Sequence, residues 1–367
     1  MTDHSSLVRP WALAPCALTL FAQSLIAQSA ASRIDTYLRH RPDGPFSGVV
    51  LVARDGKVFF ERAYGFADAE LGVQNAPPLR FPVGSLTKPL TATAVMRLVE
   101  QSTLRLSDSV CAYLVQCPDA WRAVTLRTLL SHTSGIPDLF TELPAAPVES
   151  TRAVIDAAIA KHLQDTLRSR PGERYAYSNF GYFLLGYALE VVSRAPWETV
   201  LQTQVFAPAM MRETRYDDVW AVLPGRVRGY TRAHGALRNI PYHDHAAYAA
   251  GGLLSTARDL ERFDLALSHG RIVADSTLRE MTTPGLGDYG LGWQVITVFG
   301  RPMRNHTGSL DGFASHLAHY DDGTTIIVLS NVESEPAKAT ACDIAALIFG
   351  LTPSSRREGQ SACRPSP

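Results

Sequence analysis

Hydrophobic and polar positions near both ends of the chain follow the patterns of β-strands. Two such runs flank Asp55 and Gly56 in SGVVLVARDGKVFFERAYGFAD, and this Asp-Gly pair is a strong signal for a β-hairpin. Near the other end, GWQVITVFG, FASHLAHY and TTIIVLSN have the composition of three further strands, with a turn at 321–323 between the last two. The pattern therefore predicts five strands.

Residues between these strands, from about 85 to 280, show helical spacing. TRAVIDAAIAKHLQDTLRSR is predicted to end at Pro171, SNFGYFLLGYALEVVSR before Pro196, and STARDLERFDLALSHG at Gly270. Strands from both ends of a chain can pair only if those ends meet in one sheet. We therefore expect an α+β fold, in which an antiparallel five-stranded sheet is flanked by helices and carries an inserted helical lobe.

The first 30 residues have the organisation of a secretory signal peptide. Arg9 precedes the apolar stretch WALAPCALTLFAQSLIA, and the small residues of AQSAA offer cleavage sites. The alternative is an uncleaved membrane anchor. The apolar stretch is short for a spanning helix and contains Pro15, which favours the signal peptide. We expect export to the periplasm or the medium, a single domain over 31–351 and a loose polar tail over 352–367.

The charge of the chain is balanced. The 367 residues are 46% hydrophobic, with 35 Lys and Arg against 35 Asp and Glu. This balance gives no support for nucleic-acid binding or for attraction to acidic lipid. We expect no nucleic-acid partner, no stable membrane insertion of the mature protein, and a monomer. Lysine is rare, which makes Lys88 one of only four.

Four cysteines follow the predicted signal peptide, an even number that permits two disulfides in an oxidising compartment. We expect Cys111 to pair with Cys117 and Cys342 with Cys363, one of three possible connectivities. The cysteine spacings fit no zinc pattern, and the His-Asp-His run at 243–245 lacks a third ligand at useful spacing. No metal and no cofactor are therefore expected.

The stretch VGSLTKPLTATAVMRLV presents a serine and a lysine three residues apart at the start of a helix. Pro89 is tolerated only in a first helical turn, which places the helix start close to Ser85. Ser85 and Lys88 then share one face, and the Ser85 N–H is a potential oxyanion donor. A lysine, unlike an arginine, can lose its proton when it is desolvated. The alternative is a capping serine beside a solvated lysine.

Two further stretches carry residue types suited to acyl transfer. In PGERYAYSNFGYFLLG, Tyr177 could shuttle a proton beside a lysine and Asn179 could bind an amide, although a core tyrosine and a helix cap would give the same pattern. In RNHTGSLDGF, Gly308 on a predicted edge strand would let a substrate backbone approach closely, with the Ser309 N–H as a second oxyanion donor. An ordinary strand end is the alternative there.

Taken together and in this order, SLTK, YSN and HTG resemble the serine β-lactamase and penicillin-binding protein superfamily. LLSHTSGIP, AAGGLLSTARDLERF and YGLGW also match its usual run of sequence, and the resemblance covers about residues 40–350. Class C β-lactamases, D-alanyl-D-alanine carboxypeptidases and related esterases are the most similar members. The fold of that superfamily, an antiparallel sheet with a helical lobe, agrees with the pattern of predicted elements.

The resemblance implies a role for each matching residue. Ser85 would be the acylated nucleophile, Lys88 and Tyr177 would take its proton and pass one to the leaving group, and Asn179 would hold the amide side chain of a substrate. The chain would then be a serine hydrolase acting on a small-molecule or cell-wall peptide substrate, at the amide bond of a D-amino-acid peptide or a β-lactam. An esterase, or a β-lactam or cell-wall sensor that is acylated without turnover, is the alternative.

The HTG motif would form the far wall of the site. His306 and Thr307 would contact a substrate carboxylate, and Gly308 would leave room for the substrate backbone. Many members have lysine in place of His306, and since histidine titrates near neutrality, we expect a weaker attraction for carboxylate at about pH 7 to 8. Arg301 and Arg304 are the nearest arginines in sequence, and neither can be assigned to the carboxylate.

Overall fold

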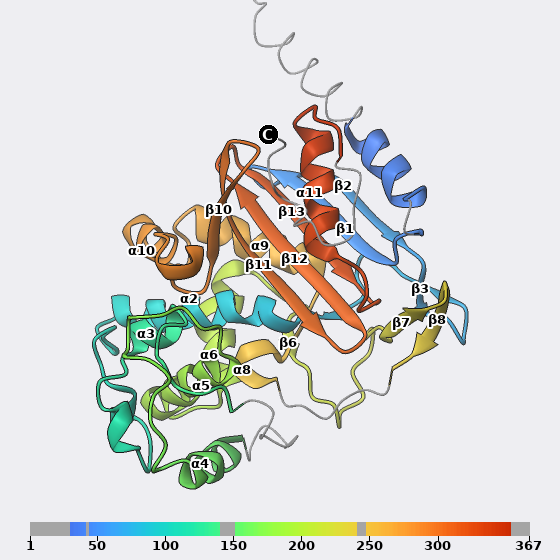
Figure 1. Ribbon diagram of the computed structural model, residues 1–367. Coiled ribbons are helices and arrows are strands. Elements are labelled where there is room, and N and C mark those ends of the chain that lie inside the picture. Colours follow the sequence, from blue (N-terminus) through green and yellow to red (C-terminus); the bar gives the residue numbers. More distant parts are fainter. Residues whose placement is uncertain (1–29, 42–43, 140–150, 241–246, 354–367) are drawn as a thin grey trace, which may run out of the picture.

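The computed structural model describes residues 30–41, 44–139, 151–240 and 247–353 (Figure 1). All but the last residue of the predicted signal peptide, most of the predicted tail and the His-Asp-His run at 243–245 lie outside these ranges. Export and the tail therefore stay predictions. Within the described ranges, none of the helices combines the length and apolar character needed to cross a bilayer.

Strands from both ends of the chain form one antiparallel sheet in the order β10-β11-β12-β13-β1-β2. These strands are β1 Gly48–Arg54, β2 Lys57–Tyr64, β10 Gln294–Val298, β11 Arg301–Leu310, β12 Phe313–Tyr320 and β13 Thr324–Ser330. β1 joins the two ends of the chain, since it pairs with β13 from Gly48↔Ser330 to Arg54↔Thr324. The predicted α+β architecture is confirmed, whereas the predicted number of strands is wrong: the sheet has six. The additional strand is β11, RPMRNHTGSL. Its HTG motif is predicted to lie on an edge strand, but its polar sequence keeps it out of the five strands that the pattern predicts.

Both faces of the sheet are covered (Figure 1). One face packs against α11 (Ala337–Ile348) and the helical residues 30–39, and the other against the helical part of the chain, including α2 (Thr87–Glu100) and α9 (Ala257–Ser268). Alternate residues of β1 enter the two cores, because successive strand side chains point to opposite faces. Burial on both sides explains why β1 and β13 are almost continuously apolar.

The helical lobe lies between β2 and β10 in the sequence, and its helix α9 packs against β13 and β1. Its remaining helices are α3 Leu126–Leu130, α4 Thr151–Lys161, α5 Asn179–Ser193, α6 Trp197–Leu201, α7 Ala207–Ala209, α8 Tyr248–Gly251 and α10 Asp275–Met281. Single turns or short irregular helices are η1 Gly84–Leu86, η2 Val110–Ala112, η3 Asp119–Trp121, η6 Gln202–Phe206 and η7 Leu286–Asp288. Short strands are β3 Phe66–Asp68, β4 Val73–Gln74, β5 Phe81–Pro82, β6 Arg215–Tyr216, β7 Tyr230–Ala233, β8 Ala236–Asn239 and β9 Leu253–Ser255.

Predicted helix ends are correct where a stop signal follows directly. α5 ends at Ser193, just before a left-handed Arg194 and Pro196, and α9 ends at Ser268, just before Gly270. α4 instead ends at Lys161, well before Pro171, so that prediction is wrong. The residues after Lys161 form turns whose backbone amides are held by the loop after α3.

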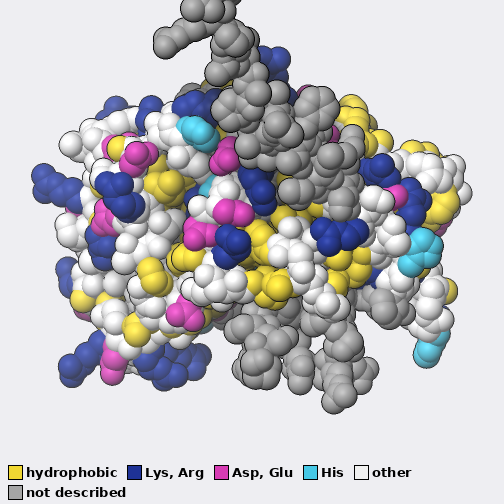
Figure 2. All heavy atoms as spheres, turned by 90° about the horizontal axis from the view of Figure 1, so that it is seen from above, with side chains coloured by type: hydrophobic (Ala, Val, Ile, Leu, Met, Phe, Trp, Pro, Cys, Tyr) yellow, Lys and Arg dark blue, Asp and Glu magenta, His cyan; other side chains and the backbone are white. Residues whose placement is uncertain are grey.

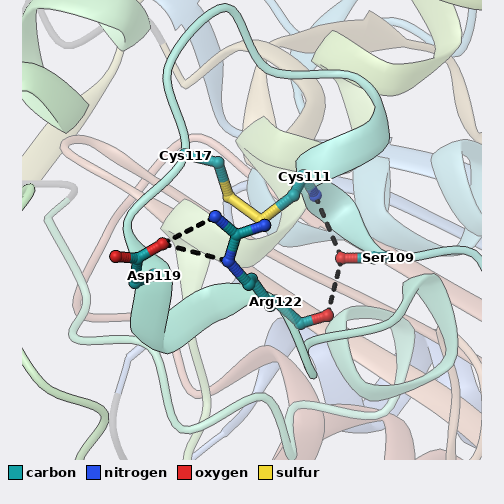
Figure 3. Close-up of a disulfide and its surroundings, with 5 residues drawn as sticks. All are labelled: Ser109, Cys111, Cys117, Asp119 and Arg122. Atoms are coloured by element: carbon teal, nitrogen blue, oxygen red, sulfur yellow. Dashed lines mark hydrogen bonds and ion pairs between the residues drawn. A yellow bond between two sulfur atoms is a disulfide. The ribbon is translucent and has the colours of Figure 1, made fainter.

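The predicted disulfide between Cys111 and Cys117 is confirmed, with the two Cα atoms 5.3 Å apart (Figure 3). The hydroxyl of Ser109 accepts from the Cys111 N–H at 3.3 Å and donates to the Arg122 carbonyl at 2.9 Å. Arg122 in turn donates to Asp119 through two guanidinium nitrogens. The second predicted pair includes Cys363, which lies outside the described residues, and stays a prediction.

On the face shown in Figure 2, basic and acidic side chains are interspersed, in keeping with the balanced formal charge.

A cluster of charged side chains is buried between α9 and the sheet. Asp264 on α9 accepts from Arg304 at 2.7 Å, from Thr325 at 2.6 Å, and pairs with His319 at 2.8 Å. Burial disfavours the charge of Asp264, yet His319 and Arg304 outweigh it and hold the pKa of this carboxyl well below its usual value. This cluster fixes α9 to three strands of the sheet.

Replacing Asp264 with alanine should lower the free energy of unfolding by about 3 to 5 kcal/mol, because the buried Arg304 loses its partner. Asp322→Ala, which breaks a pair with the much more exposed Arg54, should cost less than about 1 kcal/mol. Urea denaturation measures both. Equal costs at the two positions would contradict the role of the cluster.

The lowered pKa of Asp264 stabilises the fold only while this carboxyl is ionised. The difference in the free energy of unfolding between wild type and Asp264→Ala should therefore shrink below about pH 4.

Candidate active site

Ser85 lies at the mouth of α2. The single turn η1 runs directly into this helix, and Pro89 sits in its first turn, as predicted. Ser85 is half-buried, whereas the residues on either side of it are buried. The hydroxyl of Ser85 is thus presented at one accessible point of an otherwise closed surface.

Lys88 is fully buried one turn deeper. Its Nζ lies 3.0 Å from the Ser85 hydroxyl, 2.8 Å from the Asn179 side-chain oxygen and 2.8 Å from the Ala250 carbonyl oxygen. The last two oxygens can only accept, so each takes one N–H of the amine. Ser85 can donate as well as accept, and a neutral amine has one lone pair left. Two donated bonds and one accepted bond therefore satisfy a neutral Lys88 completely.

The protonation of Lys88 follows from its surroundings. Burial lowers the pKa of this amine well below its ordinary value, and the charge of Asp138 opposes that shift without reversing it. The aromatic rings of Tyr177 and Tyr182 lie 4.7 Å and 5.5 Å from Nζ. The arrangement can take the proton of the Ser85 hydroxyl.

Tyr177 stands beside this pair at the entrance to α5. Desolvation raises the pKa of its phenol, and a hydrogen bond with Ser85 only partly offsets the shift. A charged lysine nearby would favour phenolate, but burial acts the other way on both groups: it raises the pKa of Tyr177 and lowers that of Lys88. Tyr177 is therefore suited to give a proton to a leaving group.

The start of α5 is held by a residue that the sequence analysis does not single out. Asp138 accepts the backbone N–H of Asn179 at 3.2 Å and that of Phe180 at 2.8 Å. These bonds satisfy first-turn donors of the helix and orient Asn179 toward Lys88. With its oxygen bound to Lys88, Asn179 can offer a substrate its NH₂ group.

Two glycines let the backbone of β11 approach the backbone of η1. A Cβ on Gly308 would lie 2.0 Å from the Val83 carbonyl oxygen and 3.1 Å from the Ser85 nitrogen. A Cβ on Gly84 would lie 2.9 Å from the Ser309 nitrogen. Neither position admits a side chain, so the two glycines allow close contact between the backbone segments that carry the predicted oxyanion donors, the N–H groups of Ser85 and Ser309.

The β11 strand is open beside Ser85 although it is not the outermost strand of the sheet. β10 pairs with β11 from Gln294↔Asn305 to Val298↔Arg301, so residues 306–310 have no strand partner on that side in the described parts of the chain. The HTG motif therefore lies on an exposed strand edge, the place where an extended substrate could add. The predicted edge location holds locally.

The family description Beta-lactamase matches residues 34–350 of this chain. The chain belongs to the beta-lactamase family. PbpX of Bacillus subtilis (strain 168), which its name classes with the penicillin-binding proteins, is 30% identical over 307 residues, which cover 82% of this chain and 74% of PbpX. The predicted superfamily is thus confirmed.

Solved structures of the same fold include two that cover most of the chain. The octameric penicillin-binding protein homologue from Pyrococcus abyssi has a TM-score of 0.75 and 25% identity, covering 92% of this chain and 78% of its own. D-amino acid amidase from Ochrobactrum anthropi SV3 has a TM-score of 0.72 and 23% identity, covering 89% and 98%. The second likeness shows the fold alone.

His306 departs from the lysine found in many members of the beta-lactamase family. The Thr307 carbonyl oxygen, 2.8 Å from Nδ1, can only accept, so Nδ1 carries the proton. Burial lowers the pKa of His306 to about 3, so the ring is neutral and Nε2 accepts from the Tyr289 hydroxyl at 2.9 Å. The expectation that His306 titrates near neutrality is therefore wrong: its ring faces Tyr177 as a neutral wall, with the ring centroids 6.3 Å apart.

The structure separates His306 from Thr307, which the sequence analysis treats as one wall. Successive residues of β11 point to opposite faces, and the Thr307 hydroxyl bonds with His316 Nδ1 at 2.9 Å on the other side. Neither candidate arginine reaches the site, since Arg304 is bound to Asp264 and Arg301 lies over Phe349. The carboxylate contact expected of this wall thus finds no fixed positive charge among these residues.

Ala250, Asp138, His132 and Tyr289 are contacts that the sequence analysis does not assign. Their stretches, AAGGLL, HTSGIPD and DYGLGW, are visible only as phrases typical of the superfamily, because nothing in a single sequence connects them to Lys88 or Tyr177. GLGDYG, which fits a dinucleotide-binding pattern on paper, forms the turn η7 before β10. In the part of the chain that the structure describes, no group of three His, Cys, Asp or Glu residues could hold a metal ion.

Replacing Asp138 with asparagine should move the acidic limb of the pH profile of kcat/KM to lower pH. The Asp138 charge raises the pKa of Lys88, so its removal lets the amine lose its proton at lower pH. A chromogenic ester serves as substrate, and Asp119→Asn, on an exposed turn, is the matched control that should leave the limb in place. A shift to higher pH would contradict a neutral Lys88 as the base.

Replacing His306 with glutamine should leave the shape of the pH profile between about 6 and 8 unchanged, whatever it does to the rate. A histidine with a pKa of about 3 does not titrate in that interval. The same ester assay measures the effect. A limb near pH 6.5 that is present in wild type and absent from His306→Gln would show that His306 does titrate there.

Proposed function

We propose that the protein is a serine hydrolase that forms an acyl-enzyme at Ser85, with the amide bond of a D-amino-acid peptide or a β-lactam as its substrate. One observation carries the proposal: the Nζ of a fully buried lysine lies 3.0 Å from a serine hydroxyl, and burial lowers the pKa of that lysine. Such a pair has no structural need to be desolvated. It is what nucleophilic catalysis by serine requires.

The proposed reaction has two halves. Lys88 takes the proton of Ser85 as the hydroxyl oxygen bonds to the substrate carbonyl carbon, and the N–H groups of Ser85 and Ser309 stabilise the resulting oxyanion. The bond to the leaving nitrogen breaks as Tyr177 gives that nitrogen a proton and recovers one from Lys88. A water molecule then attacks the ester of Ser85 by the reverse sequence and releases the acid.

The names of the relatives support an amide substrate, since a penicillin-binding protein and a D-amino acid amidase are among them. A second candidate, an esterase of the same fold, is favoured by the neutral His306. A wall without positive charge does not need a carboxylate on the substrate, and simple esters have none. The two candidates share the acyl-enzyme and differ only in the bond that is broken.

Replacing Ser85 with alanine should abolish both turnover and adduct formation. Mature protein is mixed with a penicillin, a D-Ala-D-Ala peptide and a short-chain nitrophenyl ester, and products and intact mass are followed together. We expect activity to fall by a factor of about 10⁴ or more, because the nucleophile is lost while the fold is kept. Ser193→Ala, at the exposed end of α5, is the matched control that should keep full activity.

Product formation that survives in Ser85→Ala would overturn the proposal. An adduct on wild-type Ser85 that never releases product would point instead to a sensor that is acylated without turnover. Hydrolysis of the nitrophenyl ester alone would favour the esterase over the amidase.

A further inference from the structure

His132 accepts backbone hydrogen bonds from the residues on both sides of Tyr177. Its carbonyl oxygen accepts the N–H of Ala176 at 2.8 Å, and its Nδ1 accepts the N–H of Ser178 at 3.1 Å. One residue thus fixes the backbone immediately before and immediately after the phenol. The residue that follows it, Thr133, extends the contact by accepting the N–H of Gly172 at 2.8 Å.

The imidazole of His132 also supports the Tyr177 ring. The two ring centroids are 4.3 Å apart and the planes are inclined by 35°. Tyr177 is 40% exposed, so its ring has fewer packing contacts than a core tyrosine and the imidazole is a substantial part of them. Two further aromatic rings contact the His132 imidazole. The ring centroids of Tyr182 and Tyr289 lie 5.1 Å and 4.7 Å from its own.

The hydrogen bond from Ser178 determines the state of the imidazole. A nitrogen that accepts an N–H carries no proton, so a neutral His132 has its hydrogen on Nε2. That Nε2 is buried and has no hydrogen-bond partner among the described residues. Burial lowers the pKa of His132 well below its usual value, which keeps Nδ1 available as an acceptor.

The position of His132 is costly for the fold, which argues against a mere packing role. Its φ of 56° lies in the left-handed region, which few residues other than glycine adopt, although histidine is among the more tolerant. It is 1% exposed, and its Nε2 has no hydrogen-bond partner in any segment that the structure describes. Strain and an orphan donor persist where the surroundings require a particular residue.

We propose that His132 is a positioning residue that sets the backbone and the ring of Tyr177 in register with Lys88 and Ser85. The inference rests on the proposed function for its catalytic consequence, and on contacts alone for its structural one. The phenol can give its proton only if it stays near Ser85, and a displacement of about 1 Å at a catalytic group costs on the order of 100-fold in rate.

Two substitutions separate the parts of this role. His132→Leu removes the acceptor for Ser178 and the flat ring, and we expect kcat to fall about 100-fold with KM changed less than about threefold. His132→Asn tolerates the left-handed backbone and places an oxygen close to the position of Nδ1, so kcat should stay within about tenfold of wild type. The ester of the preceding section is a suitable substrate.

A double-mutant cycle with Tyr177→Phe tests whether His132 acts through the phenol. In the Tyr177→Phe background, His132→Leu should change kcat less than about threefold, since the group it positions is already absent. Ile344→Ala, a cavity in α11 on the far face of the sheet, controls for lost stability and should keep kcat at a comparable melting temperature. If His132→Leu does not fold, His132→Asn enters the same cycle.

The inference is overturned if His132→Leu keeps kcat within threefold of wild type, if its effect adds fully to that of Tyr177→Phe, or if Ile344→Ala loses as much activity. The positioning role of His132 can be tested even if the proposed hydrolase function is wrong. Should Ser85→Ala retain turnover, a crystal structure of His132→Leu still shows whether His132 holds the Tyr177 ring in place. A Tyr177 ring displaced by about 1 Å or more supports the positioning role, and an unmoved ring overturns it.

Discussion

Burial of one amine sets the terms for the whole site. A lysine side chain taken out of water must either keep its charge and find anions or lose its proton and find acceptors. Lys88 finds two carbonyl-type oxygens and a hydroxyl within 3.0 Å, and the only charge that acts on it noticeably belongs to the exposed Asp138. These partners come from η1, α5 and α8, so the elements that satisfy the amine are the elements that must meet for the site to exist.

The sheet and the helical lobe make their contact beside Ser85 mainly through backbone atoms. Gly84 and Gly308 allow η1 and β11 to touch, and the Ser315 hydroxyl donates to the Val83 carbonyl at 2.7 Å beside that contact. Because these groups are backbone or short side chains on regular elements, the expected oxyanion donors have little freedom to move. A rigid contact of this kind stabilises charge without reorganisation at the moment of reaction.

The neighbourhood of Ser85 is neutral and aromatic. His132 and His306 both have their pKa lowered by burial, and Tyr177 and Tyr289 both have theirs raised, so none of these four groups carries charge near neutral pH. Protons can be passed among groups that begin and end uncharged, with Lys88 as the one that gains a charge in between. The same neutrality separates this chain from relatives in which a lysine occupies the position of His306, and it bears on which substrates the site accepts.

Much of this protein could be predicted from its sequence because the responsible signals are local. The hairpin at Asp55, the helix start beside Pro89, the helix stop before Pro196 and the disulfide of Cys111 and Cys117 each depend on residues that are neighbours in the chain. The order of the three short motifs was enough for the family. Convergence of Ser85, Lys88 and Tyr177 followed from that resemblance.

Only the tertiary structure could decide what depends on burial and on distant partners. The strand β11 belongs to the sheet because β10 and β12 pair with it, whereas its polar sequence does not show a strand of ten residues. The state of His306 depends on Tyr289 and on exclusion of water, and the neutral state of Lys88 depends on Ala250 and Asn179. Since desolvation is a property of the assembled fold and not of a residue, a single sequence identifies the reactive groups, while their protonation follows from what surrounds them.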